Sequence, residues 1–217
     1  MNDASGNTVT ELVAGANGTA SGASVTNKGK IGNARDFGSV SNKGYIKLPS
    51  SVGGVVAKPH TIAFWIYPTD VTKANQVLFA TSGGSSQAGN YIMMNGAGAS
   101  GGAIHTHLTN GAGGYCLEGN SSTKTKTPLV NGKWQHVAFA FTGGTYSYYI
   151  NGKLDKTGSG GACGGNIKTK PVVGMHINEK DQAFAGRLDE LAMWSRALSA
   201  KEVALVYGGG DGVAPQK

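Results

Sequence analysis

The chain contains a series of short apolar or alternating runs, each closed by turn-forming residues. Tyr45–Leu48 alternates and stops at Pro49, and His60–Tyr67 is almost continuously apolar up to Pro68. β-Branched and aromatic residues fill these runs, and their short length favours strands over helices. Further runs follow at short intervals, at 76–81, 91–95, 103–109, 134–142, 146–150 and 171–175.

Turn signals and one helical segment complete the pattern. An Asn-Gly pair at 151–152 directly follows one of the runs, which is a strong hairpin signal. A capping box between Ser199 and Glu202 begins the only helix that we expect. We therefore predict a single all-β domain over 1–217, a two-sheet antiparallel sandwich with one short C-terminal helix. The tail from 208–217 is expected to be a linker or frayed end.

Composition narrows the class of protein. Glycine contributes 36 of 217 residues without a three-residue period, which excludes collagen and indicates many tight turns. The net charge is +7, but the lysines are scattered and no basic helix occurs. We expect solvated loop charges and no nucleic-acid partner.

The chain has no apolar run of the roughly 20 residues that a membrane helix needs. Its first residues lack the basic and apolar regions of a signal peptide. We expect either an excerpt of a longer secreted protein or a protein that leaves the cell by another route, as virion proteins do. Membrane insertion is not expected, and the expected location is extracellular, on a cell surface or on a virion.

Five motifs, in order along the chain, resemble the laminin-G-like/concanavalin A-like lectin-glucanase family. They are an opening "GKxGxAxxFxG" element, a core strand, a "WxHVA" strand, a "YxNGxL" hairpin and a closing "DE…WxRALS" block, at Gly29–Phe37, Thr61–Ile66, Gly132–Ala138, Tyr149–Leu154 and Gly186–Ser199. The resemblance implies a jelly-roll sandwich.

The resemblance also implies a metal and a possible partner. Asp3 and Asn7 lie in a "DxSGN" element, and together with Asp189 they are expected to hold a calcium ion, which prefers oxygen ligands. The alternative is that Asp189 only caps a turn. The family usually has a strand ahead of this element, so either the chain is truncated or a protein partner supplies the missing strand.

Catalysis is not expected, although this sandwich also carries hydrolases. A retaining glycosidase needs two carboxylates about 5 Å apart. The chain has no E-x-D-x-E triplet, which is the pattern of related hydrolases, and no G-x-S-x-G nucleophile elbow.

A sugar site needs an exposed aromatic residue beside polar side chains. Two loop regions offer this combination, and two histidines lie between them if the strands pair as neighbours. The candidate ligand-binding residues are Tyr91, Asn95, His105, His107, Tyr115, Glu118 and Asn120. The alternative is that these are ordinary polar loop residues. The two histidines share one strand face but have no evident third metal ligand.

Cys116 and Cys163 are the only cysteines, and both lie near glycine-rich turns. We predict a disulfide between them, worth about 4 kcal/mol on the loop-entropy estimate. Two buried free thiols are the alternative.

Together these features predict a non-catalytic carbohydrate-binding or adhesion module whose partner is a glycan or glycoprotein. The alternative is a structural, assembly or receptor-binding protein of a virion or cell surface, which uses the sandwich for protein–protein contacts.

Overall fold

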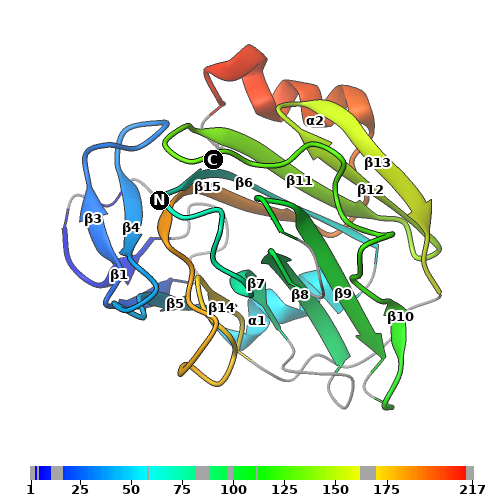
Figure 1. Ribbon diagram of the computed structural model, residues 1–217, viewed down its shortest axis with the longest axis horizontal. Helices are drawn as coiled ribbons and strands as arrows, with labels where there is room; N and C mark the ends of the chain where they lie inside the picture. The colour runs from blue at the N-terminus through cyan, green and yellow to red at the C-terminus, as the bar shows by residue number, and fades with distance from the viewer. Residues whose placement is uncertain are drawn as a thin grey trace.

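The computed structural model is a sandwich of two antiparallel sheets (Figure 1). It describes residues 3, 5–10, 17–57, 59–81, 88–96, 100–110, 112–161 and 170–213. The eight-stranded sheet has the order β1 (Thr8–Val9), β2 (Gly18–Ser21), β5 (Tyr45–Lys47), β14 (Val172–Val173), β7 (Gln76–Ala80), β8 (Ala88–Met94), β9 (Ile104–Asn110) and β10 (Tyr115–Leu117). The seven-stranded sheet has the order β13 (Lys153–Ser159), β12 (Thr145–Ile150), β11 (Gln135–Phe141), β6 (His60–Pro68), β15 (Gly186–Trp194), β4 (Ala34–Gly38) and β3 (Ser24–Thr26).

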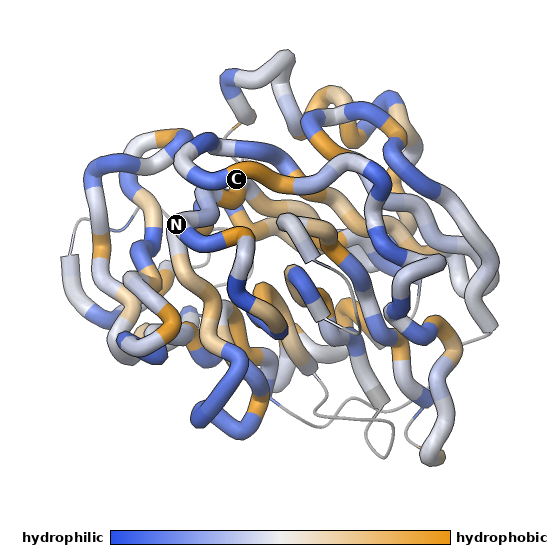
Figure 2. Tube along the Cα trace, in the orientation of Figure 1, coloured by the Kyte–Doolittle hydropathy of each residue, from blue (hydrophilic) through white to orange (hydrophobic). Residues whose placement is uncertain are grey.

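The main core lies between the two sheets, where the apolar stretches of the tube in Figure 2 face one another. Period-two alternation explains the arrangement on β6, where Ile62, Phe64 and Ile66 point inward and are fully buried. Phe79 and Phe139 meet them from β7 and β11. Each such side chain contributes about 1.5–3 kcal/mol when it leaves water.

Helix α2 (Ala200–Tyr207) covers the outer face of the seven-stranded sheet, as Figure 1 shows. Val203 packs on Ala63 and Ala138, whose small side chains let the helix come close to the strands. The predicted capping box of Ser199 and Glu202 is confirmed, and the helix ends at a left-handed glycine.

A second helix was not predicted. α1 (Ser50–Gly53) is one turn long and continues into a 3₁₀ turn at Gly54–Ala57. No apolar period marks so short a segment, because one turn cannot present a repeating face. Neither helix is long and apolar enough to cross a membrane, within the part of the chain that the structure describes.

The predicted tail is partly ordered. Gly208–Gly210 form a 3₁₀ turn, and the amide of Gly212 donates to the carbonyl oxygen of Tyr207. Gly212 packs against Ile31 and Trp65. The glycines after α2 therefore turn the chain back onto the sheet as far as residue 213.

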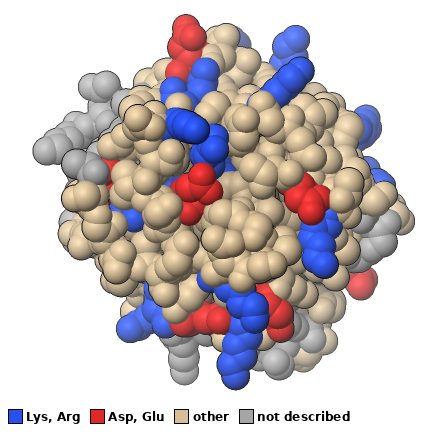
Figure 3. Space-filling view, turned by 60° about the vertical axis from the view of Figure 1, so that its left-hand side comes forward, with Lys and Arg blue, Asp and Glu red and all other residues tan. Residues whose placement is uncertain are grey.

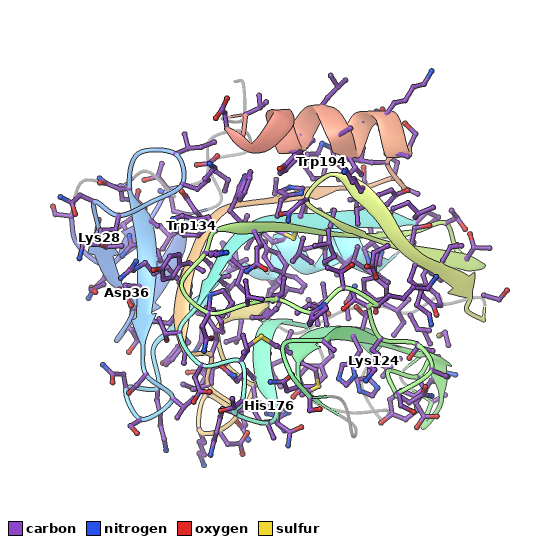
Figure 4. The ribbon with its side chains drawn as sticks, turned by 45° about the horizontal axis from the view of Figure 1, so that its top comes forward. Lys28, Asp36, Lys124, Trp134, His176 and Trp194 are labelled. Atoms are coloured by element: carbon purple, nitrogen blue, oxygen red, sulfur yellow. The ribbon has the colours of Figure 1, made fainter. Side chains whose placement is uncertain are left out.

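The three tryptophans are not part of the main core. Trp65 is buried, but on the outer face of the seven-stranded sheet, where its ring stacks on Tyr207 at 5.5 Å. Trp134 and Trp194 are only half-buried, and Figure 4 shows Trp194 near α2. All three lie outside the main core between the sheets.

Charged side chains of both signs are interspersed over the face drawn in Figure 3.

Candidate functional site

Four rings follow one another across the outer face of the eight-stranded sheet. β9 pairs with both β8 and β10, so Tyr91 lies opposite His107 and Tyr115 lies next to this pair. The ring centroids are 5.4 Å apart between Tyr115 and His107, 6.0 Å between His107 and Tyr91, and 5.6 Å between Tyr91 and His176. We call these four residues the ring row. Strand register brings together side chains that are distant in sequence.

Residue alternation explains why the histidines of β9 face outward. Ile104 and Leu108 belong to the core between the sheets, so His105 and His107 point to the other face. The two imidazole centroids are 5.2 Å apart. Figure 4 shows His176 and Lys124, which border this region, on the side of the sandwich away from α2.

His107 has a defined tautomer. The backbone amide of Gly119 donates to its Nδ1 atom at 3.2 Å, so in the neutral ring Nε2 carries the proton. Burial lowers the pKa of His107, and the nearby carboxylate of Glu118 only partly opposes this effect. A Cβ atom at Gly119 would lie 3.0 Å from the carbonyl oxygen of Thr106 and 3.1 Å from His107 Nε2, so a larger residue would crowd the ring. The ring therefore presents a neutral N–H donor.

His105 is the more deeply buried histidine, with 0% of its surface exposed. Neither ring nitrogen has a hydrogen-bond partner among the described residues. Burial, together with the charges of His107 and Lys124, lowers the pKa of His105 to about 3. The ring is therefore neutral at physiological pH.

The loop at 176–182 forms one rim of the ring row. The hydroxyl of Tyr91 donates to the side-chain oxygen of Gln182, and burial raises the pKa of that tyrosine. Glu179 pairs with Lys47 at 2.5 Å between carboxylate oxygen and Nζ, which ties the loop to β5. Glu179 and Asp181 are two residues apart but lie in this loop and not on a strand, and the carboxylate of Glu179 is occupied by the lysine.

The other rim carries the most accessible ring. Tyr115 is 46% exposed, and Glu118 is also exposed. Asn120 instead shapes the adjoining turn, since its Oδ1 atom accepts from the backbone amide and the hydroxyl of Ser122. This rim therefore combines the exposed aromatic ring of Tyr115 with the exposed carboxylate of Glu118, which can accept hydrogen bonds.

The structure brings together only part of the predicted ligand set. Tyr91, His105, His107 and Tyr115 form one group with Glu118 beside it. Asn95 is buried and its side-chain amide holds neighbouring loops, donating to the carbonyl of Val71 at 2.5 Å and accepting from the amide of Gly102 at 2.8 Å. The side chains of Asn95 and Asn120 therefore form hydrogen bonds that hold their own loops. His176 was not predicted, because it lies in an irregular loop that no strand pattern marks.

The predicted calcium ligands are engaged by hydrogen-bond donors. Asp3 accepts from Arg35 at 3.0 Å and from the amide of Thr10 at 3.0 Å. Asp189 accepts from the backbone amides of Lys30 and Ile31, each at 2.9 Å. N–H groups repel a cation, so these residues do not fit an ion shared between Asp3 and Asp189.

The third predicted calcium ligand is Asn7. Asn7 is exposed, and its carbonyl accepts from the amide of Ala20 at 2.7 Å. No group of three or more histidine, cysteine or acidic side chains positioned for a metal occurs in the described ranges. Calcium binding itself stays a prediction.

Cys116 lies on β10, next to Tyr115, and is disulfide-bonded. Cys163, the other cysteine of the chain, lies outside the described residues, so the predicted pairing stays a prediction. The amide of Gly161 donates to the carbonyl of Cys116 at 2.5 Å, which holds the chain beyond β13 against this edge strand.

Comparison with known proteins supports the same fold. The model of the laminin-G-like family described as "Concanavalin A-like lectin/glucanases superfamily" matches residues 40–204. The sushi, von Willebrand factor type A, EGF and pentraxin domain-containing protein 1 of Rattus norvegicus is 28% identical over 175 residues. That match covers 74% of this chain but only 4% of the rat protein.

Solved structures share the sandwich at low sequence identity. Domain 4 of the extracellular arabinanase AbnA from Geobacillus stearothermophilus, in complex with arabinotriose, has a TM-score of 0.63 and 21% identity, covering 86% of each chain. A pentraxin from Limulus polyphemus has a TM-score of 0.51 and 20% identity, covering 74% of each chain. A botulinum neurotoxin C/D receptor-binding domain has a TM-score of 0.64 and 17% identity, covering 96% of this chain and 51% of the other.

Proposed function

Because the chain belongs to the concanavalin A-like lectin/glucanases superfamily, in its laminin-G-like family, we propose that it is a non-catalytic carbohydrate-binding module of a secreted or surface-displayed protein. The observation that carries the proposal is the ring row, whose outer end is the exposed ring of Tyr115. Its partner is a glycan or a glycoprotein.

The chemistry of the ring row suits a sugar. A sugar ring has apolar C–H faces that pack on aromatic rings, and hydroxyls that need donors and acceptors. Tyr115 supplies an aromatic face, His107 supplies the Nε2–H donor, and Glu118 supplies a carboxylate acceptor. The aromatic face and the hydrogen-bonding groups thus lie close together, on β9, on β10 and just after β10.

The length of the ring row favours an oligosaccharide over a single sugar. Its members come from β10, β9, β8 and the loop after β14, so a bound chain would run across the strands. The complex of the arabinanase domain with arabinotriose supports a ligand of this kind, although at 21% identity the likeness extends only to the fold. We therefore expect affinity to increase with chain length.

Carboxylate placement supports binding without hydrolysis. Asp36 is paired with Arg187, Glu179 with Lys47 and Glu202 with Arg196. Besides Glu179, the acidic side chains next to the ring row are Glu118 and Asp181. They lie on opposite rims, with Glu118 near His107 and Asp181 3.8 Å from His176, whereas a retaining glycosidase needs two carboxylates about 5 Å apart.

The test is a glycan array followed by titration calorimetry with neutral oligosaccharides of increasing length. Tyr115→Ala should weaken binding about tenfold, which corresponds to about 1.4 kcal/mol for the lost stacking surface. Leu205→Ala is the matched control, because Leu205 is 72% exposed on α2, on the other face of the molecule. Equal affinity of the Tyr115 variant and the wild type would remove the ring row from the proposal.

A second candidate is a protein-binding or assembly module of a virion or cell surface. It is supported by the likeness to a receptor-binding domain and by β1, which is the end strand of its sheet and could pair with a strand from a partner. Absence of any glycan ligand at millimolar concentration, together with a stable oligomer in light scattering, would favour this candidate.

A further inference from the structure

Arg35 on β4 is among the largest completely buried side chains in the described part of the chain, with 0% of its surface exposed. Its guanidinium is charged at every physiological pH. A charge taken out of water is costly unless oxygen atoms replace its hydration. The surroundings of Arg35 must therefore supply these oxygens.

Four oxygen atoms surround the guanidinium, one from a carboxylate and three from the backbone. The Nη2 atom donates to Asp3 Oδ2 at 3.0 Å and to the carbonyl of Thr8 at 2.6 Å. The Nη1 atom donates to the carbonyls of Gly6 at 2.8 Å and Ala23 at 3.5 Å. We call these four oxygens the oxygen cage.

Three of the four cage oxygens come from residues 3–8, and the fourth comes from the turn before β3. A carboxylate combined with backbone carbonyls is the ligand set that a hard divalent cation prefers. The chain thus assembles oxygens suited to a cation at the place where the family resemblance implies calcium. Within this set lies a guanidinium.

We propose that the guanidinium of Arg35 is the built-in cation of the oxygen cage and does there what a bound calcium ion would do. It fastens Asp3, Gly6 and Thr8 to the edge of the sandwich. The carboxylate of Asp189, the other implied calcium ligand, is also occupied by groups of the protein. It accepts hydrogen bonds from the backbone N–H groups of Lys30, Ile31 and Glu190, each at 2.9 Å. Both implied metal ligands are therefore satisfied by groups of the protein itself.

The first test is thermal melting of the wild type in EDTA and in millimolar calcium. The proposal predicts the same melting temperature in both. Calcium stabilises a protein only when it binds the folded state, so an increase of several degrees with calcium would overturn the proposal.

The second test removes the cation. Arg35→Ala removes the donor to Asp3 Oδ2 and to three backbone carbonyls, and should lower the melting temperature by roughly 10 °C. Methylguanidinium or calcium at millimolar concentration should restore at least half of this loss in the variant. No recovery with either cation would show that the cage does not act as a cation site.

Two further variants serve as a control and as a replacement for Arg35→Ala. Arg187→Ala removes a partly exposed partner of Asp36 and should show a smaller loss without recovery by either cation. If Arg35→Ala does not fold, Arg35→Lys takes its place: its ammonium still fills the cage, so a small loss that calcium does not reverse is expected. A calcium-dependent rise in the lysine variant would contradict the proposal.

Discussion

Acid should destabilise the fold well above the pH at which carboxylates titrate, because two histidines are buried in their neutral form. Burial lowers the pKa of His105 to about 3 and that of His136 to about 4, against an ordinary value of 6.5. Below pH 6.5 the unfolded chain therefore binds protons that the folded chain cannot accept. The stability that these neutral rings contribute is fully present above pH 6.5 and decreases as the pH falls toward their folded pKa values.

The magnitude follows from proton linkage. One pKa unit corresponds to about 1.4 kcal/mol, so each histidine costs about 1.4 kcal/mol of stability per pH unit in this range. At pH 5 the loss is about 2 kcal/mol for each residue and about 4 kcal/mol for both. That is a large part of the 5–15 kcal/mol typical of a domain.

The assay is urea unfolding followed by tryptophan fluorescence at pH 7.5, 6.0 and 5.0. His105→Asn and His136→Asn should each remove about 2 kcal/mol of the loss between pH 7.5 and 5.0. The pH dependence that remains in the double variant includes the contribution of His107, whose pKa is also lowered by burial. Most carboxylates titrate below this window, because their ordinary pKa values lie near 4. Burial raises the pKa of Asp189, but this residue is the same in the wild type and in all three variants. A double variant with the same pH dependence as the wild type would show that these two histidines do not cause the loss of stability in acid.

Three further perturbations test the packing and the edge strand. Gly174→Ala places a Cβ atom 2.2 Å from the ring of Phe37 at a φ of 83°, so a loss of about 3 kcal/mol or more in urea unfolding is expected; a loss below 1 kcal/mol would show that the turn relaxes. Ser199→Ala removes the cap of α2 and should cost about 1 kcal/mol, and an unchanged unfolding midpoint would rule out this contribution. Alkylation under denaturing, non-reducing conditions should label neither Cys116 nor Cys163, and mass spectrometry that finds both labelled would exclude the disulfide.

Strand prediction succeeded where the local pattern was strong. His60–Pro68 has a continuous β-branched and aromatic pattern and forms the nine-residue strand β6. β2 and β3 were not predicted, since their Gly, Ser, Thr and Ala residues carry little apolar signal. These strands depend on pairing with β5 and β4, which is tertiary information.

The candidate site was only partly predictable for the same reason. Period-two alternation was enough to place His105 and His107 on one face, and neighbouring strands then brought Tyr91 and Tyr115 to them. His176 depends on the path of an irregular loop.

Buried polar groups were harder to predict. The burial of Arg35 has no sequence signal, because arginine is usually exposed and only the oxygen cage makes its position favourable. The role of Asn95 in its loops was equally hidden, since a polar residue at a strand end suits a ligand or a turn.

Binding of a sugar chain by the ring row can be measured residue by residue in an NMR titration of the ¹⁵N-labelled protein with the best ligand from the glycan array. The Gly119 amide, which donates to His107, reports on the middle of the ring row, and the amide of Tyr115 reports on its exposed end. The largest chemical-shift changes should occur at these amides and in the loop at 176–182, while the amide shifts of α2 stay unchanged. Shifts confined to α2 and the outer face of the seven-stranded sheet would contradict binding at the ring row.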